Sequence, residues 1–238
     1  MQDRYTGDIG DYVKYALLRA IRGRRRLGVA WYLHPAGGPL GDGKHVAYLR
    51  DEDRWRHLDP ELFDVLKRLV DTDDRSVRTV QAAGVLANAA FAPELLDVRR
   101  VPVRSREQWR RDWFERVRHR LSDCSLVFAD PDNGLFRDER FRPTRSESAK
   151  RIPLAEVKAL TEDRAAVIYH HNTRRAGGHG EEIRFWMSRM PGCTYAYYWR
   201  RWSNRTFFLV NPDEEMQRRL TSFSRRWGDH GRLFSSTR

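Results

Sequence analysis

Two carboxylates follow a run of apolar residues in the middle of the chain. The segment 125–136 reads Ser-Leu-Val-Phe-Ala-Asp-Pro-Asp-Asn-Gly-Leu-Phe, so Asp130, Pro131, Asp132 and Asn133 come directly after four apolar positions. This pattern predicts a buried strand that ends in a tight turn. Ligands of open α/β sheets bind at the carboxyl ends of the strands, so we place the chemistry at this turn. A solvated turn explains the same residues equally well, because Asp, Asn, Pro and Gly all favour turns.

Lys14 is a second candidate, near the start of the chain. A helix is predicted there from the spacing of four apolar residues, which are Val13, Leu17, Leu18 and Ile21. Asp8 or Asp11 can cap its first turn, which places Lys14 beside a Gly/Asp loop. The first turns of helices attract anions, so Lys14 could hold a carboxylate or a phosphate. The alternative is a solvated lysine on an amphipathic helix.

A glycine-rich turn follows the first predicted strand. The apolar segment 27–33 leads into His34-Pro-Ala-Gly-Gly-Pro-Leu-Gly-Asp-Gly-Lys-His. Glycine lets the backbone approach a nucleotide closely, so we assign cofactor binding to His34, Ala36, Gly37 and Gly38. The turn does not match G-x-G-x-x-G, and a long flexible loop explains it equally well.

The remaining elements must position these groups. A helical insertion is predicted at about 48–95, with a helix that begins at Asp59-Pro60, and a short strand at 98–103. Helices at 106–121, 153–161 and 181–190 alternate with strands at 125–129 and 165–172, a charged loop covers 137–148, and a hairpin at 194–212 precedes a closing helix at 214–227. We therefore predict one Rossmann-like α/β domain over 1–238. Its architecture is three-layered, with a mostly parallel sheet, helices on both faces and a C-terminal antiparallel hairpin.

Substrate binding is assigned to Phe136, His170 and Arg174, which lie at or after the ends of the two central strands. His170 and His171 point to opposite faces of a continuous strand, so at most one of them faces a given site. The hairpin could also contribute to substrate binding, because it interleaves arginines with Tyr195, Tyr197, Trp199 and Trp202. Such aromatic residues can stack bases, although packing within an aromatic edge hairpin accounts for them equally well.

The net charge points to a polyanionic partner. The formal charge is +12 at pH 7, which favours nucleic acid, either RNA or DNA, although a generally arginine-rich surface would give the same charge. Two cysteines make neither a disulfide framework nor a four-ligand zinc site. The sequence has no signal-peptide pattern and no apolar run of the roughly 18–20 residues that a membrane span needs. We expect a cytoplasmic protein without a membrane partner, and the sequence does not predict its oligomeric state.

In this order of elements the chain resembles class I S-adenosylmethionine-dependent methyltransferases, and within them the bacterial large-subunit rRNA adenine-N6 methyltransferases. The segments that carry the likeness are 4–15, 32–38, Asp130-Pro131, and 209–212 with the helix that follows. The resemblance implies that Lys14 and the turn from His34 to Gly38 hold S-adenosylmethionine. It also implies that Asp130 and the Pro131 carbonyl accept hydrogen bonds from a target amine.

The segment departs from the Asp-Pro-Pro-Tyr motif of that family. Asp132-Asn133 replaces Pro-Tyr, which removes the aromatic platform for a flipped base and implies an altered target pocket around Asp132, Asn133 and Phe136. We also find no acidic residue at the end of an identifiable second strand for the ribose hydroxyls.

Two other functions fit the residues. In a metal-dependent nuclease or phosphodiesterase, Asp130 and Asp132 would hold Mg²⁺ with Asp8 or Asp11 and one histidine from His170, His171 or His179. The other is a nucleic-acid-binding module without catalysis. The methyltransferase is the first hypothesis.

Overall fold

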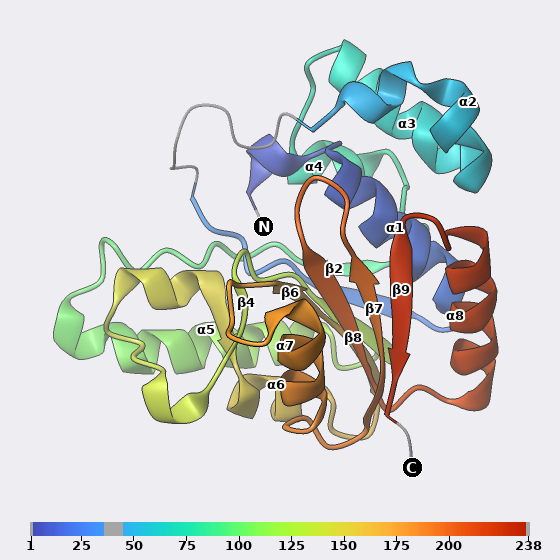
Figure 1. Ribbon diagram of the computed structural model, residues 1–238. Helices are drawn as coiled ribbons and strands as arrows, with labels where there is room; N and C mark the ends of the chain where they lie inside the picture. Colours follow the sequence, from blue (N-terminus) through green and yellow to red (C-terminus); the bar gives the residue numbers. More distant parts are fainter. Residues whose placement is uncertain (1, 36–44, 237–238) are drawn as a thin grey trace.

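The computed structural model describes residues 2–35 and 45–236 and has a Rossmann-like α/β fold (Figure 1). Its main sheet has the strand order β2-β1-β3-β6-β8-β7-β9. These strands are β1 (Leu27–Ala30), β2 (Ala90–Ala92), β3 (Leu126–Ala129), β6 (Ala165–His171), β7 (Cys193–Trp199), β8 (Arg205–Val210) and β9 (Gly231–Ser235). β2, β1, β3 and β6 are parallel, whereas β8 pairs antiparallel with both β6 and β7. The predicted mostly parallel sheet with a C-terminal antiparallel hairpin is confirmed.

Helices cover both faces of this sheet, because neighbouring residues of its central strands face opposite cores. Leu126 and Phe128 of β3 pack in one hydrophobic cluster, and Val127 and Ala129 pack in the other. The first cluster takes side chains from α1 (Ile9–Ile21), α3 (Pro60–Asp71) and α8 (Glu214–Arg226). The second takes them from α5 (Arg106–Arg120), α6 (Leu154–Leu160) and α7 (Gly178–Met187). The predicted three-layer architecture is confirmed.

The segment between β1 and β2 is mainly helical. It contains η2 (Ala47–Arg50), α2 (Glu52–Trp55), η3 (Arg56–Leu58), α3 and α4 (Val77–Ala82). The Asp59 side chain accepts a hydrogen bond from the backbone of Leu62, and Pro60 is the first helical residue, so α3 begins where its capping residues predict. The last part of the predicted insertion forms the edge strand β2 instead. Two of its three residues are alanine, which gives little strand signal.

Two local predictions differ from the structure, and one strand was not predicted. The strand predicted at 98–103 is absent from this described segment, which instead leads into η4 (Val103–Ser105). The loop predicted at 137–148 contains η5 (Asp138–Arg140) and the start of η6 (Ser146–Lys150), and on either side of it β4 (Gly134–Phe136) pairs with β5 (Arg151–Pro153). The guanidinium of Arg110 holds this segment in place, because it is buried and donates hydrogen bonds to the carbonyls of Ser148 and Arg151. The edge strand β9 has no counterpart among the predicted elements.

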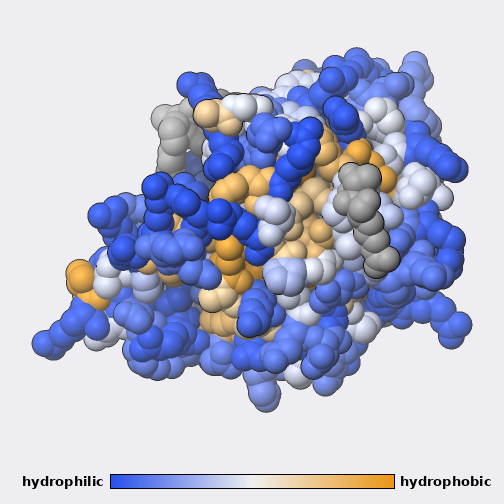
Figure 2. All heavy atoms as spheres, turned by 60° about the horizontal axis from the view of Figure 1, so that its bottom comes forward, coloured by the Kyte–Doolittle hydropathy of each residue, from blue (hydrophilic) through white to orange (hydrophobic). Residues whose placement is uncertain are grey.

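Charged and polar residues cover most of the face in Figure 2, and apolar residues gather in a band between them. Among the described residues, no helix is long and apolar enough to cross a membrane.

Candidate functional site

The site lies where the chain leaves two neighbouring parallel strands in opposite directions. From β1 the chain moves to β2 on one side, and from β3 it moves to β6 on the other. The backbone N–H of Asp130 donates to the carbonyl of Ala30 at 2.9 Å, so the two strands stay in contact to the last residue of β3. Such a reversal leaves a crevice at the carboxyl ends of the strands, and Asp130 stands in it.

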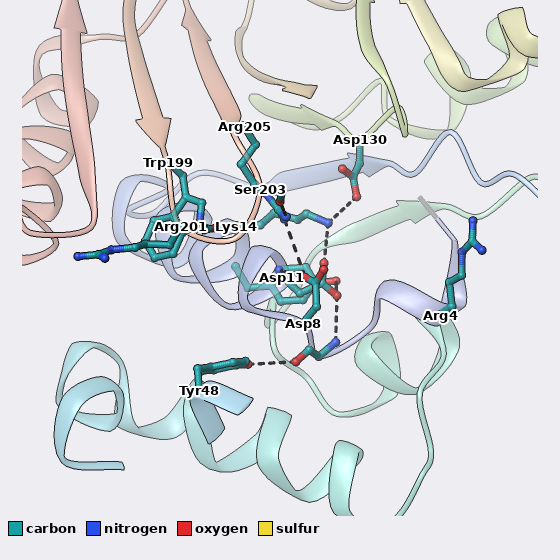
Figure 3. Close-up of polar contacts among 12 residues, drawn as sticks. Arg4, Asp8, Asp11, Lys14, Tyr48, Asp130, Trp199, Arg201, Ser203 and Arg205 are labelled. Atoms are coloured by element: carbon teal, nitrogen blue, oxygen red, sulfur yellow. Dashed lines mark hydrogen bonds and ion pairs between the residues drawn. The ribbon is translucent and has the colours of Figure 1, made fainter. Parts of the chain in front are cut away.

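A cavity of about 340 Å³ opens beside this residue. Most of its walls come from the N-terminal segment with the first turns of α1, the turn after β3, the end of β6 and the hairpin between β7 and β8, and His45 and Lys150 complete the lining. The charged residues among its lining are Asp8, Asp11, Lys14, Asp130, Asp132, Lys150 and Arg205. Figure 3 shows Asp8, Asp11, Lys14, Asp130 and Arg205. The cavity is therefore strongly polar, with carboxylates and cations interleaved.

Lys14 joins the helix to the sheet in this cavity. Its Nζ donates to Asp11 Oδ1 at 2.7 Å and to Asp130 Oδ2 at 2.8 Å, and all three residues are at most 3% exposed. Burial alone would lower the pKa of Lys14, but the charges of Asp11 and Asp130 outweigh it and raise that pKa above its ordinary value. The ammonium therefore stays charged and holds Asp130 at the carboxyl end of β3.

Asp11 is fixed by the start of α1 around it. Its Oδ2 accepts from the backbone of Gly7 at 3.2 Å and from the hydroxyl of Tyr15 at 3.4 Å, and its own N–H donates to Asp8 at 2.9 Å. Burial raises the pKa of Asp11 to about 6, against the opposing charge of Lys14. A carboxyl with this pKa can change protonation state near neutral pH.

Arg205 reaches the same cavity from the first residue of β8. Its guanidinium lies against α1 at Gly10, where an added Cβ would be 1.1 Å from Nη1, so glycine is required for this approach. Nη1 lies 3.9 Å from Asp8 Oδ1, and Nη2 donates to the hydroxyl of Ser203. The Nε has no hydrogen-bond partner among residues 2–35 and 45–236. A buried guanidinium with spare donors is suited to binding an anion in the cavity.

The turn after β3 supplies Asp132 and Asn133 to the cavity lining, whereas Pro131 is buried. Asp132 accepts a hydrogen bond from the side chain of Gln2, and the backbone N–H of Asn133 donates to the carbonyl of Lys150 at 2.8 Å. The structure thus brings Lys14, Asp130, Asp132 and Asn133 together around one cavity.

The predicted cofactor turn is only partly described. His34 is half-buried, its Nδ1 is 2.9 Å from the Pro35 carbonyl oxygen, and it does not line the cavity. Ala36, Gly37 and Gly38 lie outside the described residues. His45, at the other end of the same turn, does line the cavity.

The three residues assigned to substrate binding lie away from the cavity lining. Phe136 packs against the guanidinium of Arg151, 4.8 Å from its ring, and Arg174 is exposed. His170 is buried, accepts from the backbone of Leu135 on Nδ1 at 3.1 Å, and places Nε2 3.2 Å from Glu182.

His171 takes the opposite face of β6 and lines the cavity. His179, the third histidine considered for metal binding, contacts the hydroxyl of Tyr198 at 2.7 Å instead.

Two further residues carry a site signal that the sequence did not reveal. Arg205 appeared only as one of several hairpin arginines, because its contact with Gly10 joins distant segments. Glu94 stands two residues after β2, and its Oε2 is buried with no hydrogen-bond partner in the described part of the chain. Its other oxygen, Oε1, lies 3.5 Å from Arg120. Recognition of β2 would have singled out Glu94 as the acidic residue at the end of the second strand.

The described residues contain no group of three or more His, Cys, Asp or Glu side chains arranged to hold a metal ion. The ammonium of Lys14 occupies the space between Asp11 and Asp130. A cation at this point would have to displace it.

None of the known protein-family models matches this chain, and a search of curated proteins finds no sequence similar to it.

Proposed function

We propose that this protein is an S-adenosylmethionine-dependent methyltransferase that acts on an amine in nucleic acid. The observation that carries the proposal is the position of Asp130. Its buried carboxylate stands at the carboxyl end of β3, beside β1 and next to a polar cavity. This is the place in an α/β sheet where a nucleotide-like ligand and a reacting group can meet.

The order of elements supports the proposal. The resemblance implies a leading helix, a first strand with a glycine turn, αβ units, and a hairpin with a terminal helix. The chain has α1, β1, the units around β3 and β6, the β7–β8 hairpin and α8 in that order.

Glu94 is positioned to bind the ribose of the proposed cofactor. The ribose of such a cofactor offers two hydroxyls as donors, and a carboxylate at the end of the second strand can accept from both. Glu94 stands at that point and has one buried oxygen without a hydrogen-bond partner among the described residues. S-adenosylmethionine would supply an electrophilic methyl group, and the turn that begins at His34 would border its adenosyl part.

The roles of the other residues follow from their contacts. Lys14 keeps Asp130 in position, so that Asp130 and the Pro131 carbonyl can accept hydrogen bonds from a target amine. Accepting both protons directs the nitrogen lone pair away from them and toward the methyl group. Arg205 supplies a positive charge for a phosphate of the target. Asp132 and Asn133 offer polar contacts where related enzymes have an aromatic platform.

Calorimetry with S-adenosylmethionine tests this function most directly. We expect the wild-type protein and Asp130→Asn to bind the cofactor with similar affinity. Transfer of a labelled methyl group to nucleic acid should fall by about 10²- to 10⁴-fold in Asp130→Asn, because the charged acceptor of the amine is replaced by a neutral amide. A folded wild-type protein that binds neither S-adenosylmethionine nor S-adenosylhomocysteine would refute the methyltransferase proposal.

A metal-dependent phosphodiesterase is the second candidate. It is favoured by the four carboxylates of Asp8, Asp11, Asp130 and Asp132 around one cavity. The position of Lys14 makes it the weaker proposal. Thermal stabilisation by Mg²⁺ that disappears in Asp130→Ala and Asp132→Ala, without cofactor binding, would reverse the order. If neither ligand binds, a nucleic-acid-binding module without catalysis is the remaining reading.

A further inference from the structure

The tip of the β7–β8 hairpin separates the cavity from a second, basic pocket. Ser203 faces the cavity, whereas Arg201 lines a separate pocket of about 530 Å³. Figure 3 shows the two directions, because Arg201 extends away from Lys14 and Asp130 while Ser203 and Arg205 lie toward them. The two pockets are therefore only a few residues apart along one turn.

Three distant segments build the second pocket, which we call the hairpin-tip patch. Its polar lining comes from α2 and η3, from the hairpin tip, and from the end of α8 with the turn that follows. These residues are Arg54, His57, Arg201, Arg226, Asp229 and His230. Three arginines and two histidines thus surround a single carboxylate.

The arginines of the patch have no carboxylate partner among the described residues. Within the part of the chain that the structure describes, Arg54, Arg201 and Arg226 form no ion pair, and Arg201 and Arg226 donate instead to the backbone carbonyls of Asp229 and His57. The Nε of Arg201 is buried with no partner among the described residues. Many arginines on other surfaces are paired, as Arg111 is with Glu107 at 2.7 Å. Asp229 therefore offsets only part of the positive charge of the patch, and the excess suits a site for an anion.

The positive charge of the patch affects the protonation of His230. It is 8% exposed, its ring stacks on Trp55 with 4.4 Å between centroids, and its Nδ1 has no hydrogen-bond partner in the described residues. Burial lowers the pKa of His230, and the charges of Arg201, Arg54 and His57 lower it further, with only Asp229 opposing them. A phosphate bound among these groups would reverse that repulsion.

Trp202 adds an aromatic surface beside the patch. It is 50% exposed and its ring centroid lies 5.6 Å from that of Trp55, so one part of the ring is supported and another faces solvent. Its φ is +58°, a left-handed conformation that is rare for a bulky side chain. Such strain persists where the surrounding structure holds it and concentrates at functional sites. By contrast, Tyr197 and Trp199 of the same hairpin are buried in the core.

We propose that the hairpin-tip patch binds the phosphate backbone of a single nucleic-acid strand, with a base stacked on Trp202, and leads the strand over the hairpin tip to the cavity. This inference rests on the proposed function, because it takes nucleic acid as the substrate. A single strand is required, since stacking on a protein side chain needs a base that is free of its neighbours. Arg205 and Ser203 would meet the strand at the cavity end.

The test compares two double variants that remove the same charge. Arg54→Ala with Arg226→Ala changes the patch, and Arg104→Ala with Arg116→Ala changes exposed residues of η4 and α5, away from it. Fluorescence anisotropy with labelled oligothymidylate and oligouridylate of about 12 nucleotides measures affinity between about 50 and 200 mM NaCl. We expect the patch variant to bind at least about 10-fold more weakly and to lower the salt slope by about 1.4, which corresponds to two lost phosphate contacts. The control should bind like the wild type.

Two further readouts separate a nucleic-acid site from an ordinary charged surface. Trp202→Ala should weaken binding about 5- to 150-fold, with partial recovery in Trp202→Phe, because each stacked base contributes strongly. The pKa of His230, followed by NMR and assigned with His230→Gln, should rise when the oligonucleotide binds. Inorganic phosphate at an equal phosphate concentration should leave it nearly unchanged.

Several results would overturn the inference. These are equal losses in both double variants, wild-type affinity in the patch variant, or an unmoved His230 pKa. An equal response to inorganic phosphate would reduce the patch to a simple anion site, and equally tight patch-dependent binding of a duplex would refute the single strand. Calorimetry with S-adenosylmethionine is measured separately on the same variants. Oligonucleotide binding that depends on the patch, without cofactor binding, would refute the methyltransferase proposal and support the proposed role of the patch.

Discussion

Replacement of Lys14 by methionine should leave the buried carboxylate of Asp11 without its compensating ammonium. Lys14 contacts Asp11 and Asp130 at 2.7 and 2.8 Å inside the protein, so its removal leaves two buried carboxylates without this ammonium. Loss of one partner from a buried ion pair lowers the free energy of unfolding by about 3–5 kcal/mol. We expect Lys14→Met to cost this amount near pH 8.

The loss in free energy of unfolding caused by Lys14→Met should increase with pH. In the wild type the folded pKa of Asp11 is about 6, above the ordinary value of 3.8, so the folded state favours the protonated acid. This group therefore destabilises the fold progressively as pH rises from 3.8 to 6, and its effect is constant above that. Without Lys14 the folded pKa rises further, and the loss continues above pH 6 at about 1.4 kcal/mol per pH unit. The difference between wild type and variant should widen by about 2–3 kcal/mol between pH ~6 and pH ~8.

Urea unfolding followed by tryptophan fluorescence measures both quantities. Lys67→Met is the matched control, because it removes the same charge from an exposed pair with Glu52 and should change the free energy of unfolding little at either pH. Adding Asp11→Asn to Lys14→Met should reduce the widening, since Asp11 no longer titrates. An equal cost of Lys14→Met at both pH values would refute the assignment of the pH dependence to Asp11.

Three other substitutions test separate parts of the site. Gly10→Ala should displace the Arg205 guanidinium, whose Nη1 lies 1.1 Å from the position of the new Cβ, and so lower oligonucleotide affinity as Arg205→Ala does. The thermal midpoint should change little, because alanine stabilises a helix by about 1 kcal/mol relative to glycine. Unchanged oligonucleotide affinity would contradict this prediction. Glu94→Gln should weaken S-adenosylmethionine binding about 10- to 100-fold in calorimetry and leave oligonucleotide affinity intact, since a charged acceptor is lost; a parallel loss of both would point to misfolding. His170→Gln should lower stability by about 1–3 kcal/mol without affecting cofactor binding. Burial lowers the pKa of His170 in the folded state. The stability that the neutral ring contributes is therefore fully present above pH ~6.5 and is lost as pH falls through the folded pKa. Urea unfolding should show a smaller loss of stability in acid for the variant than for the wild type.

Elements with a strong local signal could be predicted from the sequence. α1 begins at Ile9, directly after Asp8, whose side chain caps it, and its apolar spacing marks the helix to Ile21. β3 is a continuous apolar run, and proline two residues after Ala129 ends it, so Asp130 could be placed at a strand end. In each case the residues that decide the structure are neighbours in the chain.

Weak or misleading local signals produced the failures. β2 is three residues long and lies on the edge of the sheet, so pairing with β1 rather than its own composition makes it a strand. The segment 98–103 has β-branched residues, but no neighbouring strand pairs with it among the described residues. The side chains of His170 and His171 had to face opposite ways, yet only the helices packed on each side decide that His171 meets the cavity.

The sequence by itself determined the kinds of groups present: a strand that ends in carboxylates, a helix that begins with Asp and Lys, and a basic aromatic hairpin. Only the tertiary structure decided that Lys14 and Asp130, 116 residues apart, form an ion pair, and that Arg205 lies on Gly10. Side-chain spacing is a local property of helices and strands. The meeting of distant segments depends on strand order and on which helix packs against which face, and in this protein that order brings the two charges together.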